Sequence, residues 1–230
     1  MAIAGGFDDA ASWWTLSKYD GMGFMSERNE LGSGACRPYD RERSGTVLGD
    51  GAAFLVLEEM EAARARGARI LAELAGYGSG YDCHKPVTPR PDGRGLVQAM
   101  QAALRDAGTT AGAIGHVAAH GSGTRLGDAS EARAIRAVFG EGAAKLSGTS
   151  VKAATGHLMA AAGALNVAVA ALALHHRVVP PTLNLQVVDE ECTMDWVRGA
   201  AREVRTDQAL ALARGLSGHN VALVLRAVDS

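Results

Sequence analysis

The longest apolar run in the chain, LMAAAGALNVAVAALAL at residues 158–174, restricts the folds that this sequence can adopt. A helix made of these residues is apolar on every side, so it must be buried in a protein core or in a membrane. The run is long enough for a marginal membrane span. However, it is dominated by alanine, contains Gly163 and Asn166, and lacks an aromatic belt. We therefore expect the central helix of a layered domain and predict no membrane contact.

The rest of the chain alternates between strand-like and helical patterns. Apolar runs predict strands at residues 52–57, 70–77, 116–119 and 146–151, and residues 209–225 predict a strand, a tight turn and a strand. Helical patterns cover residues 58–66 and 96–104. The 52–57 run is interpreted as a buried strand, and the Gly- and Pro-rich residues 78–93 as a loop. Strands that alternate with helices favour an α/β sheet between helical layers.

Composition and charge exclude several classes of function. The 230 residues are 47% hydrophobic and 21% charged, with a formal net charge of −2 and no basic block. Nucleic acid is therefore not an expected partner. The N-terminal MAIAGGFDD lacks the pattern of a signal peptide, and Cys36, Cys83 and Cys192 lack the spacing of a zinc site. We expect reduced thiols, no bound metal and a cytoplasmic location.

Two histidines stand in glycine-rich turns at predicted strand–helix junctions. His120 lies in AHGSGTRLGDASE and His157 in VKAATGHLMAAAG. Open α/β sheets build their sites at the carboxyl ends of strands, so this setting favours a functional role over the structural role of most lone loop histidines. Because His157 precedes the apolar helix, we expect its imidazole to stay neutral and to donate an N–H. Two neutral imidazoles that donate to one oxygen would stabilise an enolate or an oxyanion.

Lys152 and Glu131 each allow two interpretations. Lys152 lies between a predicted strand and the turn before His157, where it is either a surface lysine or a fixed positive charge that orients His157. In the second case Glu131 is its candidate partner. Alternatively, Glu131 forms a capping box with Asp128, three positions earlier, and opens a helix that continues to Phe139. The residues alone leave both questions open.

Three segments around these residues resemble the β-ketoacyl-acyl carrier protein synthases of the thiolase superfamily. They are AHGSGTRLGDASEARAI, VKAATGHLMAAAGALNVAVAALAL with PPTLNL, and CRPYDRERSGTVLGDGAAFLVLEE. The matching spacing runs from AIAGG near the start to the terminal VALVL. The resemblance implies an incomplete thiolase-like α/β fold with αβαβα layers. In this fold residues 1–67 form the remainder of the N-terminal half, and residues 68–230 form the whole C-terminal half.

The resemblance also implies a reaction, the decarboxylative Claisen condensation of malonyl-acyl carrier protein with an acyl thioester in fatty acid or polyketide biosynthesis. The catalytic positions of the family fall on His120, His157, Lys152 and Glu131. In that family two histidines drive malonyl decarboxylation, and a structural lysine is paired with a glutamate. Ser122 and Thr124 occupy positions whose hydroxyls contact the pantetheine arm of the acyl carrier protein. The carrier protein is thus an expected partner, and no separate cofactor is implied.

The chain departs from this family because it lacks the nucleophilic cysteine, which in the family lies upstream of the strand matched by AIAGG. Cys36 and Cys192 are expected to be packing residues. Cys83 lies beside His84, but adjacency in sequence does not establish the facing geometry of a thiol–imidazole pair. The chain is therefore interpreted as the C-terminal part of a ketosynthase, either a natural split subunit or a truncated product. We expect a complementary N-terminal ketosynthase chain to supply the cysteine in a hetero-oligomer. That chain would also cover the sheet edges that this chain exposes.

The closing hairpin departs from the family as well. The family pattern GFGGTN after a phenylalanine is here RGLSGHN, from Arg214 to Asn220. In the family the phenylalanine gates the acyl pocket, and its backbone N–H helps to form an oxyanion hole. Because an unpaired buried charge is costly, we expect Arg214 to point away from the acyl pocket and to pair with a carboxylate. This leaves Leu216 as the apolar contact near the acyl channel.

Two alternative functions stay open. The start of the closing hairpin, ARG, resembles the chain-length-factor subunits of type II polyketide synthases, which shape the acyl tunnel without catalysis. Arg214 and Leu216 favour that alternative, whereas the retained His120, His157 and Lys152 argue against it. A thiolase-type acyl transferase outside carrier-protein chemistry is the weaker alternative, because AHGSGT and TGH fit the ketosynthases better.

Overall fold

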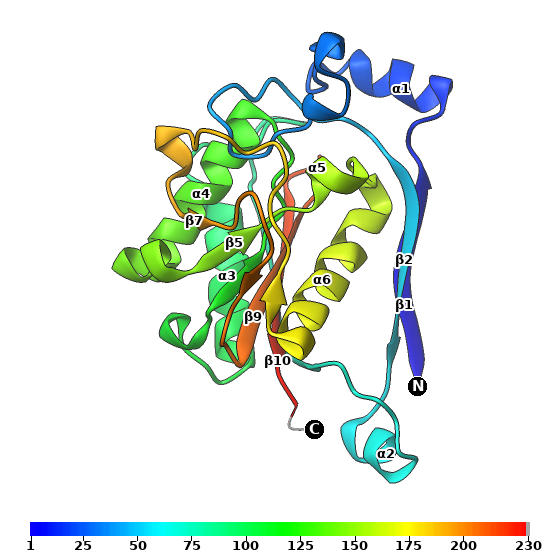
Figure 1. The fold of residues 1–230 in the computed structure, drawn as a ribbon, viewed down its shortest axis with the longest axis vertical. Coiled ribbons are helices and arrows are strands. Elements are labelled where there is room, and N and C mark those ends of the chain that lie inside the picture. Colours follow the sequence, from blue (N-terminus) through cyan, green and yellow to red (C-terminus); the bar gives the residue numbers. More distant parts are fainter. Residues whose placement is uncertain (229–230) are drawn as a thin grey trace.

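The computed structural model describes residues 1–228, and its main element is a six-stranded mixed sheet in the order β3-β10-β9-β4-β5-β7 (Figure 1). The strands are β3 (Glu73–Tyr81), β4 (His116–Ala118), β5 (Ser147–Thr149), β7 (Asp195–Trp196), β9 (Gln208–Arg214) and β10 (His219–Arg226). β9, β4, β5 and β7 are parallel, and β10 pairs antiparallel with both β9 and β3. The carboxyl ends of β4 and β5 therefore open at one edge of the sheet.

Helices cover both faces of this sheet. On one face, α3 (Arg94–Asp106) and α4 (Arg125–Phe139) bury the main core with the strands. On the other face, α6 (Ala162–His176) packs against β9, β4 and β10. A second set of contacts joins α6 to the strands β1 and β2, so this helix lies between two sheets (Figure 1). The predictions of an α/β fold and of a central apolar helix are confirmed.

The segment Met159–His176, which contains α6, is long and apolar enough to cross a membrane by length and composition. Its packing accounts for the same properties within a core. Ala170, Ala171 and Leu174 are buried in a cluster with residues of β9 and β10. Small side chains on the remaining surface of α6 let a second sheet approach from the opposite side. The helix is therefore apolar on every side because it has strands on both sides.

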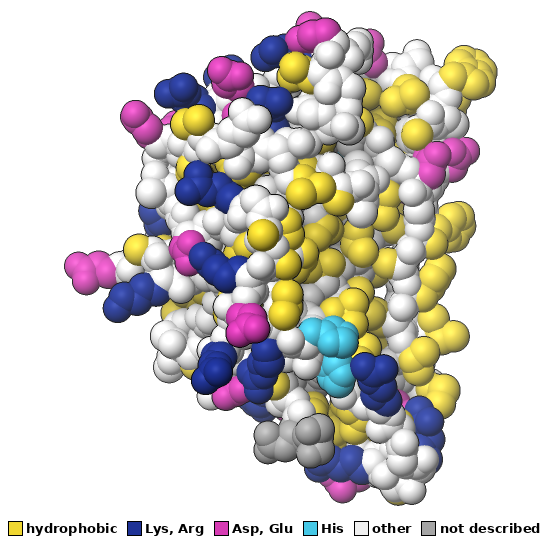
Figure 2. All heavy atoms as spheres, viewed as in Figure 1, with side chains coloured by type: hydrophobic (Ala, Val, Ile, Leu, Met, Phe, Trp, Pro, Cys, Tyr) yellow, Lys and Arg dark blue, Asp and Glu magenta, His cyan; other side chains and the backbone are white. Residues whose placement is uncertain are grey.

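The second sheet is a two-stranded antiparallel ladder of β1 (Ala2–Asp9) and β2 (Asp50–Leu57). Its outer face, turned away from α6, carries Ile3, Phe7, Phe54 and Val56, which are 60–74% exposed. Figure 2 shows hydrophobic side chains that project along the edge of the molecule where Figure 1 places this ladder. The prediction of a buried strand at residues 52–57 is wrong for this face. Alternate residues of a strand point to opposite faces, and no other part of residues 1–228 covers the outer one.

Two further elements differ from the sequence-based expectations. β3 continues to Tyr81, although the Gly- and Pro-rich composition of residues 78–93 predicts a loop. The glycines there serve close packing, because a Cβ on Gly78 would lie 2.1 Å from the Ala99 carbonyl of α3. The helix α1 (Trp13–Asp20) has no buried residue, and so it shows no apolar periodicity that a sequence could reveal. The fold also contains the shorter helices α2 (Met60–Ala65) and α5 (Lys152–Thr155), a ladder of β6 (Val178–Val179) with β8 (Arg202–Glu203), and short 3₁₀ helices.

The start of α4 also corrects a prediction. Thr124, not Asp128, caps the helix, and its hydroxyl accepts the Gly127 N–H at 3.1 Å. The Asp128 carboxylate instead accepts the N–H groups of Tyr39 (2.8 Å) and Gly123 (3.1 Å). The capping box of Asp128 with Glu131 is therefore wrong, and both carboxylates hold loops in place at the end of β4.

Candidate active site

The two histidines lie next to each other at the carboxyl ends of β4 and β5. Two residues after β4 comes His120, and His157 follows the short helix α5. Their ring centroids are 5.3 Å apart, and the rings meet edge to face. Both rings line a cavity of about 770 Å³ that also reaches the turn after β9. The structure thus brings together two residues that are far apart in sequence.

Backbone N–H groups fix the tautomer of both imidazoles. Nδ1 of His157 accepts the N–H of Met159 at 3.1 Å, and Nδ1 of His120 accepts the N–H of Arg214 at 3.3 Å. A neutral imidazole that accepts at Nδ1 carries its proton on Nε2. Each ring therefore presents an Nε2–H group as a donor.

Both imidazoles are held neutral. Burial lowers the pKa of His157 well below its ordinary value of 6.5, and the charge of Lys152 lowers it further. The pKa of His120 is lowered in the same way by burial, Lys152, His157 and Arg214. The helical segment Met159–His176 begins two residues after His157, and its first N–H donates to Nδ1 of His157, as the sequence predicts for a helix N-terminus. Desolvation and a nearby cation also disfavour the imidazolium.

The backbone of His157 is tied to the N-terminal region of the chain. Its N–H donates to the Val47 carbonyl at 2.7 Å, and its carbonyl accepts the Gly49 N–H at 3.2 Å. The preceding Gly156 has φ of 73°, and a Cβ there would lie 2.8 Å from the Cα of Gly49. Only glycine meets both demands without strain, which explains the small residues around this histidine.

Lys152 and Glu131 lie behind the cavity, under His120. Lys152 is 2% exposed, and its ammonium donates to the carbonyl of His120. The Glu131 carboxylate accepts the N–H of His120 at 2.7 Å and that of Gly121 at 2.8 Å. No ion pair joins Lys152 to Glu131 within residues 1–228. Lys152 is thus no surface residue, and both side chains hold the backbone of His120.

A buried charge cluster that sequence reasoning missed supports the same loop. Tyr39 is fully buried, donates its hydroxyl to Glu131 at 2.9 Å and stacks on Trp196 at 3.5 Å between ring centroids. Arg43 is also buried and pairs with Asp128 and Asp189 at 3.7 and 2.6 Å. The motif RPYDRERSG contains Tyr39 and Arg43, but nothing in its spacing reveals partners about ninety residues away along the chain.

Ser122 and Thr124 lie at the cavity with the two histidines. Their hydroxyls are hydrogen-bonded to each other at 2.9 Å. Because the Thr124 hydroxyl already accepts the Gly127 N–H, the Ser122 hydroxyl is the freer of the two to contact a bound molecule. Their assignment to a pantetheine arm stays a prediction.

Arg214 and Leu216 lie on the wall formed by the closing hairpin. The Arg214 guanidinium pairs with the buried carboxylate of Asp82 at 3.4 Å, as expected of a charge at this position. Its backbone N–H donates to His120, so this N–H is already engaged and does not point freely into the cavity. Leu216 is 36% exposed on the cavity wall, and its carbonyl accepts the Val87 N–H at 3.1 Å.

The cysteines lie outside this cavity. Burial raises the pKa of the Cys36 thiol to about 11 and that of the Cys192 thiol to about 12, so neither forms a thiolate readily. Cys83 is exposed. The arrangement therefore provides two donors for a developing negative charge, and within residues 1–228 no cysteine lies beside them.

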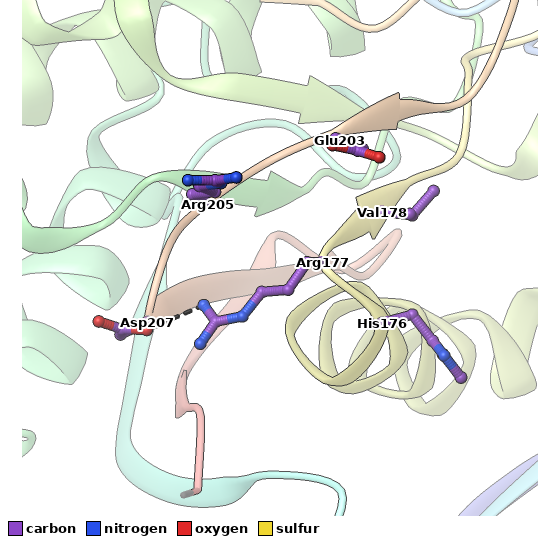
Figure 3. Close-up of a pocket in the computed structure, with 6 residues that line it drawn as sticks. All are labelled: His176, Arg177, Val178, Glu203, Arg205 and Asp207. Atoms are coloured by element: carbon purple, nitrogen blue, oxygen red, sulfur yellow. Dashed lines mark ion pairs between the residues drawn. The ribbon is translucent and has the colours of Figure 1, made fainter.

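A second hollow, of about 530 Å³, lies at the far end of α6 (Figure 3). It is open to solvent, and its Arg177 pairs with Asp207 at 2.8 Å. The 15 residues of α6 separate it from the histidines by about 22 Å. Among residues 1–228, no group of three or more His, Cys, Asp or Glu side chains is placed to hold a metal ion.

Two family models match the chain. Residues 1–63 match the N-terminal domain of the β-ketoacyl synthases, and residues 71–186 match their C-terminal domain. The chain belongs to the β-ketoacyl synthase family. The N-terminal match covers the β1–β2 ladder, and the C-terminal match of the synthase contains both histidines.

Two curated relatives within the β-ketoacyl synthases are similar to this chain in sequence along almost its whole length. The 3-oxoacyl-[acyl-carrier-protein] synthase 2 of Coxiella burnetii is 40% identical over 98% of this chain and 55% of the relative. The ketoacyl synthase alpha subunit of the tetracenomycin polyketide synthase of Streptomyces glaucescens is 39% identical over 98% of this chain and 53% of the relative. The chain thus spans about half the length of the curated relatives it matches.

Solved structures confirm the layered thiolase-like fold. A ketosynthase of a type II polyketide synthase, bound to the hexaketide and in complex with its acyl-carrier protein, superposes with a TM-score of 0.96 at 34% identity. That match covers 99% of this chain and 56% of the other. A β-ketoacyl synthase from Burkholderia phymatum gives a TM-score of 0.93 at 37% identity, with 99% of this chain and 54% of the other covered.

Proposed function

We propose that this chain is the histidine-bearing part of a β-ketoacyl-acyl carrier protein synthase, which condenses malonyl-acyl carrier protein with an acyl thioester in fatty acid or polyketide biosynthesis. One observation carries the proposal. Two neutral imidazoles share a cavity, and each has Nδ1 engaged by a backbone N–H and its proton on Nε2. Membership of the β-ketoacyl synthase family supports the same reaction.

The two Nε2–H groups would act on the thioester oxygen of a malonyl group. When the bond to the carboxylate breaks, CO₂ leaves, and the electron pair stays on the α-carbon and the thioester oxygen as an enolate. Two fixed donors in a buried site stabilise this enolate with little reorganisation. The α-carbon then attacks the carbonyl of the acyl thioester, and the cysteine thiolate leaves. Lys152 and Glu131 would keep His120 in place through its backbone.

One partner chain could supply the nucleophile and also cover the exposed apolar face of the β1–β2 ladder. We propose that a complementary N-terminal ketosynthase chain supplies the acyl-carrying cysteine, forms a hetero-oligomer with this chain and is required for activity. The described cysteines lie outside the cavity, and the outer face of β1–β2 is apolar and open. Exposed apolar faces of this kind commonly mark sites where another protein docks. This partner would also pair the free edge of β1.

The substrates would reach the cavity on the phosphopantetheine arm of an acyl carrier protein, so no further cofactor is needed. Ser122 and Thr124 support this step, because their hydroxyls lie between the cavity and the start of α4. The cytoplasmic location and the division of the chain after residue 67 also stay predictions.

Reconstitution tests the proposal. The chain is co-expressed with a complementary ketosynthase chain that carries the cysteine, and condensation is measured with acyl- and malonyl-carrier protein. We expect product from the complex and none from either chain alone. A soluble complex that loads acyl groups onto its cysteine but neither decarboxylates malonyl-carrier protein nor condenses would refute the proposed catalytic role.

A chain-length-factor-like role is the second candidate, because the charged Arg214 takes the place of the gating phenylalanine of the family. It predicts that a double His120→Ala/His157→Ala variant still supports full condensation by its partner. We expect the double variant to be inactive instead.

A further inference from the structure

Arg214 belongs to a buried polar cluster in the wall of the cavity. Its side chain is 7% exposed, and that of Asp82 is 3% exposed. The Nε–H of Arg214 donates to the Asn220 side chain at 2.9 Å, and the Asn220 amide donates to Asp82 at 2.9 Å. These three side chains therefore form a closed triangle that joins the end of β3 to both strands of the closing hairpin.

The same guanidinium reaches α4. One of its terminal nitrogens donates to the Gly127 carbonyl at 3.1 Å, and the other donates to the Ser130 hydroxyl at 3.2 Å. A Cβ on Gly95, at the start of α3, would lie 2.4 Å from the Asp82 carboxylate, so the cluster is tightly enclosed. Because each donor of this planar fork has a fixed acceptor, the guanidinium is held in one orientation.

The side-chain contacts add to the β9–β10 ladder, which pairs Arg214 with Asn220, in holding the backbone of residue 214. Arg214 is the last residue of β9, and its N–H donates to Nδ1 of His120 at 3.3 Å. This bond is slightly longer than the usual range for N–H donors, so a small displacement of the strand end would break it. The Nδ1 of His120 has no other donor among the hydrogen bonds of residues 1–228.

We propose that Arg214 is a positioning residue, whose buried side chain fixes the backbone N–H that holds His120 in the tautomer with its proton on Nε2. Without this N–H, the proton of the neutral ring can lie on either nitrogen. In the Nδ1–H tautomer, the donor that faces the cavity is lost. The role in turnover rests on the proposed function, whereas the effect on the tautomer does not.

The charge of the guanidinium acts in the same direction. Burial is the largest cause of the lowered pKa of His120, and Arg214 is one of three nearby groups that lower it further. Loss of the guanidinium therefore removes both a restraint on the tautomer and a repulsion of the imidazolium.

The test replaces Arg214 with methionine, which fills similar space without charge or donors, and with lysine, which keeps the charge but not the fork. The full chain, labelled with ¹⁵N-histidine and purified with its partner, is titrated by NMR from pH 5 to 8. We expect His120 of the wild type to stay in the neutral Nε2–H form. In both variants we expect a mixture of tautomers, with methionine also raising the pKa, while His157 stays unchanged because Met159 still holds its Nδ1.

Arg226→Met is the matched control. Arg226 lies on the neighbouring strand β10, pairs with Glu73 at 3.0 Å and donates to the Ala107 carbonyl at 3.1 Å. Its loss should lower stability without any change in the His120 signals. Decarboxylation by the complex should fall about tenfold or more in Arg214→Met, partly recover in Arg214→Lys, and stay unchanged in the control.

An unchanged His120 tautomer in a folded Arg214→Met complex would overturn the proposal. If Arg214→Met does not fold, Arg214→Lys decides alone, and a wild-type tautomer in that variant overturns it equally. If the tautomer shifts as expected but no partner supports condensation by the wild type, the positioning role stands and the proposed function fails.

Discussion

The six-stranded sheet and the β1–β2 ladder differ in how much of their apolar surface this chain buries. Both faces of the large sheet are covered, by α3 and α4 on one side and by α6 on the other. The ladder has α6 on its inner face only, and Phe7 and Phe54 on its outer face are 74% and 60% exposed. Within residues 1–228 the large sheet is therefore covered on both faces, whereas the ladder is covered on one face only.

The histidine site lies where these two regions meet. His120 is held by the complete region, through Glu131, Lys152 and the closing hairpin. His157 is held on one side by the strand segment that leads into β2. Residues 1–228 thus position the two histidines through their own hydrogen bonds.

The largest expected effect is at the site itself. His120→Ala and His157→Ala should each lower malonyl decarboxylation by the reconstituted complex about 10²-fold or more, the usual loss for one donor to an oxyanion. Acyl loading of the partner's cysteine should persist, because it does not need both imidazoles. His176→Ala, at the far end of α6, is the control and should keep full activity in a carrier-protein assay. Equal losses of activity in all three variants would contradict the assignment of the active site to His120 and His157.

The next effect concerns the open face of the ladder. The chain alone should aggregate, and Phe54→Ala should weaken binding to the complementary chain about tenfold to a hundredfold, because burial of one such side chain contributes about 1.5–3 kcal/mol. Leu74→Ala, at 46% exposure on the edge strand β3, is the control and should bind as the wild type does. Sedimentation and titration calorimetry give both results. A monodisperse, cooperatively unfolding monomer of the chain alone would contradict this prediction.

A smaller effect concerns the large sheet alone, whose stability should depend on pH through a buried histidine. Burial lowers the pKa of His116 in β4 to about 4, so the unfolded state, with a pKa near 6.5, binds more protons between these values. The stability of the large sheet should then fall as pH falls, by about 2 kcal/mol between pH 7 and 5 from this group alone. Urea unfolding of the complex, followed by the buried Trp196, should show the loss, and His116→Gln should reduce it. The same loss in the variant would show that His116 is not its source.

The smallest expected effect concerns substrate size. Leu216→Trp should shorten the acyl chain accepted by the complex, because the larger indole ring would occupy part of the cavity that Leu216 lines. Arg214→Phe should change stability or assembly more than chain length, since its side chain lies in the polar cluster. Products from a series of acyl-carrier primers decide between the two positions. A reset of chain length by Arg214→Phe alone would contradict the assignment of the hairpin.

Local patterns predicted the layered fold, the central helix and the position of the two histidines in turns that follow strands. Each of these features depends on residues close together in sequence. The predictions failed where long-range contacts decide. Glycines such as Gly78 signal a loop unless the approach of α3 is known, and the exposure of Phe54 depends on a layer that no pattern within the strand describes. The contact of Lys152 with His120 and that of Arg214 with Asp82 join segments far apart along the chain, so composition and spacing could not reveal them.

The two backbone hydrogen bonds between His157 and the segment before β2 have a thermodynamic consequence. If the proposed partner docks on the ladder and shifts residues 47–49, it also shifts His157, and the affinity for the proposed substrate would then depend on whether the partner is bound. Linkage would make this dependence reciprocal: substrate held between the histidines would change the affinity for the partner by the same factor. A malonyl thioester would then act as an assembly factor as well as a substrate, and subunit exchange should slow when it is present.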